Sequence, residues 1–345
     1  VLMEDIDQIL GAFGLDPDNY QAASFGSGLI HATFKVTRQG TPEFILQKVN
    51  HHVFRHPEDI AHNINILGRY LARNAPGYTF TVPVKTSEEE DYCMHDGAYY
   101  RLFPFVQNSH TIDVCASPTQ AWEAASQFGK FTAVLNAFDT SLLRYTIPGF
   151  HDLSWRYRQF EEALKEGDQE RLAASKTVAT RLLFYKGIVD QFEAFKSSAA
   201  FITRVTHHDT KISNVLLDEK EKGICVIDLD TVMPGLFISD VGDMIRTYVS
   251  PANEEELDLQ KIVIRKDFLD AIISGYSEHM HRLLRTEEKA AFMYAGEFMI
   301  YMQALRFYTD HLWNDRYYGA GYVGHNLVRA KNQLQLLEEL IRTAL

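Results

Sequence analysis

Cysteine is scarce in this chain, and long apolar runs are missing altogether. Its 345 residues include only three cysteines, Cys93, Cys115 and Cys225, and none of them stands in a C-x-x-C motif. A disulfide framework or a cysteine zinc site is therefore not expected, and a reducing compartment fits best. No stretch approaches the ~18 consecutive apolar residues that a membrane-spanning helix needs. Because the first ten residues also lack the features of a secretory signal, we expect a cytoplasmic protein without a membrane partner.

Positive charge is also in short supply. The 34 Lys and Arg residues are outnumbered by 46 Asp and Glu residues, which gives a net charge of −12. A nucleic-acid-binding protein normally carries a basic stripe that neutralises phosphates, and we find none, so nucleic acid is not an expected partner. No feature of the sequence implies an obligate protein partner. Hydrophobic residues make up 46% of the chain, as in a globular protein with a substantial core.

The apolar pattern changes near residue 105. Before this point, short strand-like runs lie between Gly, Pro and charged turns, and one amphipathic helix is predicted over Pro57–Asn74. After it, helical periodicity dominates. The expected strands are 20–25, 31–37, 43–49, 80–84 and 98–103, and the later helices are 117–137, 151–166, 175–197, 265–280, 286–313 and 325 to the end, around a strand-rich island over 204–230. We therefore expect an α+β, two-lobed protein-kinase-like fold, with an N-terminal antiparallel-sheet lobe over residues 1–105 and a larger, mostly helical lobe over 106–345.

The strongest local signal is the segment 205–217, which reads VTHHDTKISNVLL. Its skeleton is H-x-D-x-x-x-x-N before an apolar strand, and a second strand over 224–227 leads into Asp228-Leu229-Asp230. Phosphoryl transfer from ATP needs a carboxylate that receives the acceptor's hydroxyl proton, and oxygen ligands that hold Mg²⁺ against the phosphates. Asp209 fits the first role, whereas Asn214 and Asp228 fit the second. A hairpin of the two strands would bring Asp228 back beside Asn214.

These motifs resemble those of the aminoglycoside phosphotransferase and choline kinase superfamily, whose loop reads H-G-D-x-x-x-x-N and whose metal motif reads I-D-x-[DE]. More closely, the segments VTHHDTKISNVLLD and CVIDLDTVMPG are similar to those of the anomeric N-acetylhexosamine kinases. The tail segments ALRFYTDHLWNDRYY and HNLVRAKNQL are similar to theirs as well. The likeness runs from Ser24 through the tail. It implies phosphorylation of the C1 hydroxyl of N-acetylglucosamine or N-acetylgalactosamine, with ATP and Mg²⁺ as cofactors.

The resemblance also implies roles for individual residues. Asp209 would be the base, and Asn214 and Asp228 the Mg²⁺ ligands, with Asp230 assisting through a second metal or a water. Three further residues would act around them. His207 would brace the loop, Lys211 would steady the transferring phosphoryl group or be a surface lysine, and Asp240 would support the loop or cap the next helix.

Gly26, Ser27 and Gly28 lie between two predicted strands, where glycines let backbone N–H groups approach phosphates. A plain hairpin turn is the alternative. His31 follows this loop and is a candidate substrate contact. The strand over 44–49 is where the superfamily places a phosphate-contacting Lys or Arg, but Gln47 stands at that position. Lys48, one place further on, is the candidate cofactor contact although it should face the other side.

The acceptor site is expected beside the predicted helix over 286–313. Arg306 could donate to sugar oxygens, or could pair with Asp310 one turn later as a surface ion pair. Tyr317 could stack against the sugar ring, although packing is the ordinary role of a tyrosine. Other acceptors on the same fold (an aminoglycoside, choline, homoserine or another sugar) and a nucleotide-binding pseudokinase remain alternatives. A pseudokinase would be expected to lose Asp209, Asn214 or Asp228, and all three are present.

Overall fold

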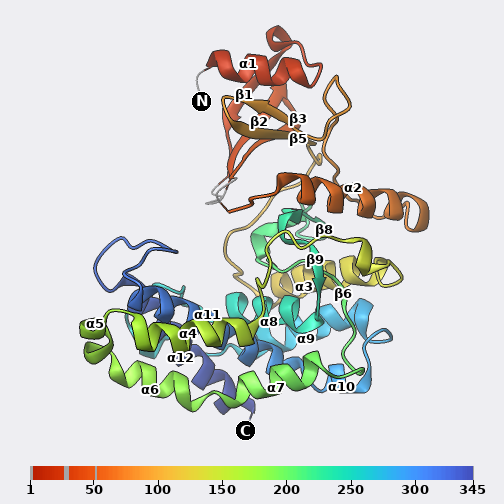
Figure 1. Ribbon diagram of the computed structural model, residues 1–345. Helices are drawn as coiled ribbons and strands as arrows, with labels where there is room; N and C mark the ends of the chain where they lie inside the picture. Colours follow the sequence, from red (N-terminus) through yellow and green to blue (C-terminus); the bar gives the residue numbers. More distant parts are fainter. Residues whose placement is uncertain (1–2, 27–30, 51–52, 345) are drawn as a thin grey trace.

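The computed structural model of the protein places a small sheet above a larger helical body (Figure 1). It describes residues 3–26, 31–50 and 53–344. The two-lobed, kinase-like α+β architecture expected from the sequence is confirmed. None of the helices in the described ranges is both long enough and apolar enough to cross a membrane.

The N-terminal sheet has five antiparallel strands in the order β1-β2-β3-β5-β4. Their bounds are β1 Tyr20–Ser24, β2 Ala32–Arg38, β3 Thr41–Val49, β4 Cys93–His95 and β5 Ala98–Pro104. Helix α1, Met3–Ala12, covers one face of this sheet at the top of Figure 1. Ile9 and Leu10 on the helix join the buried Leu46 and Leu102 in a small hydrophobic cluster. The opposite face of the sheet is therefore not covered by α1.

Helix α2, Pro57–Asn74, has the bounds predicted from the sequence, but it does not pack with the α1 cluster. Its apolar face, which includes Ile60 and Ile64, belongs to the large cluster of the helical body. Asn63 is fully buried and its amide donates to the backbone oxygens of Val232, at 3.0 Å, and Arg144, at 2.8 Å. These contacts fix α2 between the sheet and the helical body, as Figure 1 shows.

The helical body surrounds α11, Phe292–Leu312, whose side chains are almost all buried. The other helices are α3 Pro118–Val134, α4 Leu153–Glu166, α5 Gln169–Ala174, α6 Lys176–Phe184, α7 Gly187–Lys196, α8 Phe237–Tyr248, α9 Lys266–Met280, α10 Thr286–Lys289 and α12 His325–Ala344. Helices α3 and α9 touch through glycine. A Cβ atom on Gly129 would lie 2.6 Å from the backbone oxygen of Tyr276, and one on Gly275 would meet the backbone of Trp122. Side chains at either position would therefore push these helices apart.

Four short strands form the island beneath the sheet. Strand β6, Arg204–Thr206, pairs with β9, Met233–Gly235, and β7, Val215–Leu217, pairs with β8, Gly223–Val226. Both pairs are antiparallel. Two 3₁₀ turns, η3 over Ile212–Asn214 and η4 over Leu229–Thr231, lie at the ends of β7 and β8 that face the cleft.

Several predicted elements were wrong in detail. The segment 80–84 forms no strand, and Pro83 within it has no N–H to donate to a ladder. Val84 alone donates to Leu102, at 2.7 Å. The helix predicted over 175–197 is divided into α6 and α7 just before Gly187, and the one over 286–313 into α10 and α11. Helices α1 and α5 and strand β4 were not expected.

Candidate active site

The predicted hairpin of β7 and β8 brings the two sequence motifs together. Val215 pairs with Val226, and the N–H of Ile227 donates to the backbone oxygen of Asn214 at 2.9 Å. This last hydrogen bond sets Asn214 against the residue that precedes Asp228. The loop that carries Asp209 and the turn that carries Asp228 therefore meet under the sheet.

Asp209 is held by both of its polar neighbours on the loop. The amide nitrogen of Asn214 donates to the backbone oxygen of Asp209 at 2.9 Å and to its Oδ2 at 3.1 Å. The Nζ atom of Lys211 lies 3.1 Å from Oδ1. The carboxyl group of Asp209 remains partly accessible, at 18% exposure. Burial alone would lower the pKa of Lys211, but the carboxylates of Asp209 and Asp243 outweigh it and raise the pKa, so the lysine is a cation at this site.

Among the carboxylates of Asp209, Asp228 and Asp230, that of Asp228 has the least compensated negative charge. Its backbone is left-handed, with φ of 58°, and this turn directs the chain from β8 into η4. A carboxylate oxygen of Asp228 lies within 4.8 Å of ligand atoms of both Asp230 and His31. Burial, followed by the negative charges of Asp230 and Asp209, raises the pKa of Asp228 to about 6. A cation bound here would relieve that repulsion.

Asp240 supports the loop from the first turn of α8. It is fully buried, and its two carboxylate oxygens accept the backbone N–H groups of His207, at 3.0 Å, and His208, at 2.8 Å. Leu236 occupies the N-cap position of α8, so Asp240 is not the cap. Asp243, one turn later, accepts the N–H of Thr210 at 2.9 Å. Two carboxylates of one helix thus hold three backbone N–H groups of the loop, two before Asp209 and one after it.

His207 links the loop to the strand before Asp228. Its Nδ1 accepts the N–H of Asp209 at 3.3 Å, so the proton is on Nε2, which donates to the backbone oxygen of Ile227 at 2.9 Å. The ring is fully buried, edge-on to Phe128 and Phe131. His207 therefore has no face toward the cleft, in keeping with a supporting position.

His208 occupies the position at which the resembling motif has glycine. Its φ is 66°, a left-handed conformation that glycine adopts freely and other residues adopt at a cost of about 1–2 kcal/mol. Its Nδ1 lies 3.1 Å from the backbone oxygen of Thr206 and 3.2 Å from that of Thr231, so it is the protonated nitrogen. Burial lowers the pKa of His208 to about 4, and the ring is neutral.

Asp230 is already engaged by two groups of the N-terminal lobe. Arg101 on β5 contacts it with both terminal nitrogens, Nη1 to Oδ1 at 2.6 Å and Nη2 to Oδ2 at 2.9 Å. The Nδ1 of His31 accepts the N–H of Asn50 at 3.0 Å, so its Nε2 donates to Asp230 Oδ2 at 2.7 Å. Burial would raise the pKa of Asp230, but Arg101 and His31 outweigh it and hold the pKa far below its ordinary value. His31 thus lies against a carboxylate, and its sugar contact stays a prediction.

The predicted nucleotide contacts are only partly described. Gly26 has φ of 81°, which requires glycine at the start of the loop, whereas Ser27 and Gly28 lie outside the described residues. Gln47 faces the cleft, and its Oε1 accepts from Arg101. Lys48 is on the other face of β3, as alternation dictates, with its ammonium 5.9 Å from the ring centre of Tyr100. The structure does not bring Lys48 to the cluster.

Arg306 lies among aromatic rings. Its guanidinium carbon is 5.5, 5.9 and 5.4 Å from the ring centres of Phe150, Tyr317 and Tyr318. The alternative reading, an Arg306–Asp310 ion pair, is not formed. Asp310 accepts instead the N–H groups of Tyr317 and Tyr318, at 2.8 and 2.9 Å, and so shapes the loop that carries both tyrosines. Tyr317 is 69% exposed on this loop.

Arg156 is a second arginine in this region. It is 8% exposed, and burial followed by the charge of Arg306 lowers its pKa to about 10. Its hydrogen bonds go to neutral groups, Gln159 at 3.0 Å and the backbone oxygen of Phe150 at 3.4 Å, and its Nε has no partner. Within the described ranges, neither arginine forms an ion pair with a carboxylate. Two cations without counter-ions make this side of the site unsuited to a cationic ligand.

The donor set suits a hard divalent cation. Asn214 uses its amide nitrogen as a donor to Asp209, which leaves its amide oxygen as a ligand, and Asp228 supplies a carboxylate. Oxygen ligands and uncompensated negative charge are what Mg²⁺ requires. Asp230, by contrast, accepts hydrogen bonds from Arg101 and His31 at Oδ2 and forms an ion pair with Arg101 at Oδ1.

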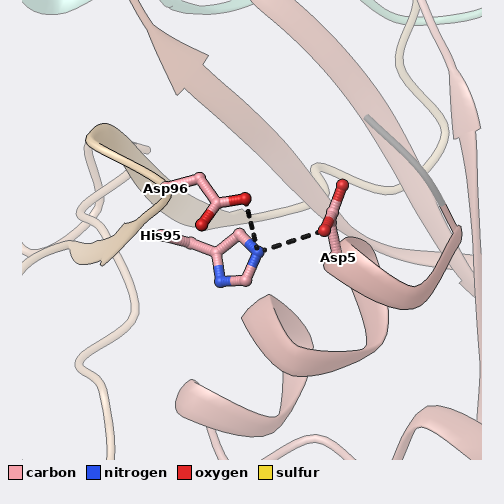
Figure 2. Close-up of side chains that lie close together, drawn as sticks. All are labelled: Asp5, His95 and Asp96. Carbon is pink, nitrogen blue, oxygen red and sulfur yellow. Dashed lines mark hydrogen bonds and ion pairs between the residues drawn. The ribbon is translucent and has the colours of Figure 1, made fainter.

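Another group of potential metal ligands lies away from the cleft (Figure 2). His95 Nε2 is 3.3 Å from Oδ1 of Asp5 on α1 and 3.8 Å from Oδ2 of Asp96 in the β4–β5 turn. His95 pairs with both carboxylates, and its contact with Asp5 fastens α1 to the sheet. This contact accounts for their arrangement without a metal ion.

Sequence reasoning missed two parts of the cluster. Arg101 was not singled out, because its importance depends on its being directly opposite Gln47 in the β3–β5 ladder. The absence of a lysine at position 47 was the one signal in the sequence that another residue, here Arg101, supplies the positive charge. Asp243 was also missed, although its spacing of three from Asp240 places both on one face of a helix.

Comparison with known proteins identifies the family and agrees with the fold. The sequence model of a family described as "Phosphotransferase enzyme family" matches residues 21–282. The fold and the site define a kinase-like phosphotransferase, and the chain belongs to this family. Nothing in the match specifies the acceptor.

Three solved structures share the fold over nearly the whole chain. A microcompartment-associated aminopropanol kinase has a TM-score of 0.66 at 15% identity, with 98% of this chain and 96% of that one covered. An aminoglycoside phosphotransferase from Alicyclobacillus acidocaldarius has a TM-score of 0.59 at 16% identity, with 94% and 92% covered. A spectinomycin phosphotransferase in complex with ADP and spectinomycin has a TM-score of 0.58 at 14% identity, with 98% and 97% covered.

Proposed function

We propose that this protein is an ATP- and Mg²⁺-dependent kinase that phosphorylates the anomeric C1 hydroxyl of N-acetylglucosamine or N-acetylgalactosamine. The observation that carries the kinase part is the meeting of Asp209, Asn214 and Asp228 at the ends of one loop and one hairpin. Structural neighbours with ADP, or with AMP-PNP and Ca²⁺, support a nucleotide and a divalent cation in this cleft. The sugar part rests on the sequence resemblance and on the charge of the acceptor side.

The acceptor side favours a neutral, oxygen-rich molecule over a cation. Arg306 offers guanidinium donors within a ring of three aromatic side chains, which is a suitable environment for the hydroxyls and the apolar face of a sugar. Arg156 adds a second unpaired positive charge nearby. An aminoglycoside or choline would have to approach two cations, neither of which forms an ion pair with a carboxylate among the described residues.

The chemistry follows from the positions of the protein groups. Bound Mg²⁺ would supply charge neutralisation on the phosphates, held by the Asn214 amide oxygen and the Asp228 carboxylate. Asp209, oriented by the Asn214 amide, would take the proton of the acceptor hydroxyl as the new P–O bond forms. Lys211, now paired with Asp209, would be in reach of the developing negative charge of the phosphoryl group. Most of the rate would come from positioning and charge, as in other phosphoryl transfers.

A panel of acceptors tests the proposal directly. ADP release is measured with N-acetylglucosamine, N-acetylgalactosamine, their 1-O-methyl glycosides, glucose, choline, homoserine and an aminoglycoside. Turnover with the free N-acetylhexosamines and none with the 1-O-methyl glycosides is expected, since the glycosides lack the C1 hydroxyl. Turnover confined to the cationic acceptors would refute the sugar assignment, and no turnover with any acceptor, despite nucleotide binding, would favour a pseudokinase.

A further inference from the structure

Arg101 is a buried cation between the sheet and the metal-binding turn. It comes from β5 and is 5% exposed. Its two terminal nitrogens reach both oxygens of Asp230, at 2.6 and 2.9 Å, and its Nη2 and Nε donate to Gln47 Oε1 at 2.8 and 3.1 Å. Burying an ion pair is costly unless good geometry and further hydrogen bonds compensate for the lost solvent. Here Nε and Nη2 donate hydrogen bonds, while Nη1 contacts Oδ1 of Asp230 as an ion pair. The contact therefore fixes Asp230 relative to β3 and β5.

The arrangement stands where kinases of this fold join a strand lysine to a helix glutamate. Position 47 holds glutamine rather than lysine, and Lys48 faces away from the cleft. Glu58, in the first turn of α2, has a side chain that is 51% exposed and pairs with His56. Arg101, which lies opposite Gln47, supplies the positive charge instead. Its carboxylate partner is Asp230, from the turn after β8.

We propose that Arg101 takes over the positioning role of the missing strand lysine. Its ion pair with Asp230 holds the Asp228–Asp230 turn against the sheet, so that Asp228 is presented to the metal–nucleotide complex. Asp230 in this scheme is the anchor of the turn and not a ligand. The inference rests on the proposed nucleotide-dependent function, but it concerns nucleotide binding and is independent of which acceptor is used.

The test is a double-mutant cycle on nucleotide binding, read by calorimetry with Mg²⁺·ADP and with ADP alone. Arg101→Gln and Asp230→Asn should each weaken Mg²⁺·ADP binding at least tenfold. The double variant should bind Mg²⁺·ADP as tightly as the single variant with the lower affinity, because both changes break the same contact. Arg38→Gln is the matched control, an exposed arginine on the same sheet, and should bind as the wild type does. The KM for ATP should rise with Arg101→Gln while the KM for the acceptor stays within twofold.

Two results would overturn the proposal. One is binding of Mg²⁺·ADP by Arg101→Gln within twofold of the wild type. The other is a double variant whose loss equals the product of the two single losses, which would mean that Asp230 acts as a ligand independently of Arg101. If Arg101→Gln does not fold, Arg101→Lys keeps the charge but loses the two-pronged contact, and unchanged Mg²⁺·ADP binding by that variant would also be decisive against the proposal. Failure of the acceptor panel would leave these binding results interpretable, so the two failures are distinguishable.

Discussion

The amide nitrogen of Asn214 donates to Oδ2 of Asp209 at 3.1 Å and to its backbone oxygen at 2.9 Å. The proposed metal ligand and the proposed base are therefore one unit, and each depends on the other for its orientation. Asp240 and Asp243 hold the same loop from behind through backbone N–H groups. Substitutions of Asp209 or Asn214 should therefore affect chemistry, whereas substitutions of Asp240 or Asp243 should affect stability as well.

Asp209→Asn should abolish most turnover while leaving nucleotide binding intact. The substitution keeps the size of the side chain but removes the carboxylate that would accept the proton, so turnover should fall by roughly 10³-fold. Mg²⁺·ADP affinity should stay within twofold. Glu219→Gln, an exposed change on the hairpin after the loop, serves as the control in the same ADP-release assay. Retention of more than a tenth of wild-type turnover by Asp209→Asn would show that Asp209 is not the base.

Asp240→Ala should destabilise the protein by about 2–6 kcal/mol. It leaves the buried N–H groups of His207 and His208 without an acceptor, and each lost partner costs about 1–3 kcal/mol. Asp240→Asn keeps one oxygen acceptor and should lose less. Urea unfolding of the three proteins measures the difference. A loss below about 0.5 kcal/mol for the alanine variant, smaller than one such hydrogen bond, would mean that water replaces the carboxylate.

The sequence predicted the fold where local signals agree with tertiary packing. Helix α2 was predicted to the residue because Pro57 starts it and its apolar side chains recur at helical spacing. The same reasoning could not show that α2 packs with the helical body, since Asn63 reveals its role only through contacts with Val232 and Arg144. The segment around Pro83 was predicted as a strand from its apolar composition. Composition does not show that Pro83 lacks the N–H that a strand ladder would use.

The site divides in the same way. The proximity of Asp209, Asn214 and Asp228 could be predicted because the loop and the hairpin are local in sequence, so motif spacing limits the separation of the three residues. The Arg101–Asp230 contact joins residues 129 positions apart and depends on strand register and on how the lobes meet, which no spacing encodes. Helical spacing also allowed an Arg306–Asp310 pair as an alternative, but two backbone N–H groups of the following loop donate to Asp310 instead.

Arg306→Gln should weaken the acceptor and spare the nucleotide. The guanidinium lies over Phe150, Tyr317 and Tyr318, and glutamine can reproduce neither the charge nor the fork of donors. We expect the KM for N-acetylglucosamine to rise at least tenfold, with the KM for ATP within twofold. Arg316→Gln, an exposed arginine on the neighbouring loop, is the control. An unchanged acceptor KM would place the sugar elsewhere in the cleft.

Acid should destabilise this protein through two imidazoles that are in edge-on contact. The rings of His151 and His208 have centroids 5.1 Å apart. Burial lowers the pKa of His208 to about 4, and burial together with the nearby His208, Arg306 and Arg156 lowers the pKa of His151 well below its ordinary value. Both are neutral in the folded protein but take up protons once unfolded, below about pH 6.5. The unfolded state then binds more protons, so stability falls as the pH drops from about 6.5 toward 4, by up to about 1.4 kcal/mol per pH unit for each group.

His208→Asn separates this effect from packing. Asparagine tolerates the left-handed backbone at position 208 and does not titrate, so the variant should be less stable at pH 7, where the contacts to Thr206 and Thr231 are lost. Its stability should nevertheless decline less steeply between pH 6.5 and 4.5, by up to about 1.4 kcal/mol per pH unit relative to the wild type. Urea unfolding at several pH values measures both slopes, with the exposed His56→Gln as the matched control. Parallel curves for wild type and His208→Asn would show that the buried ring gains a proton without unfolding, and that the acid sensitivity arises elsewhere.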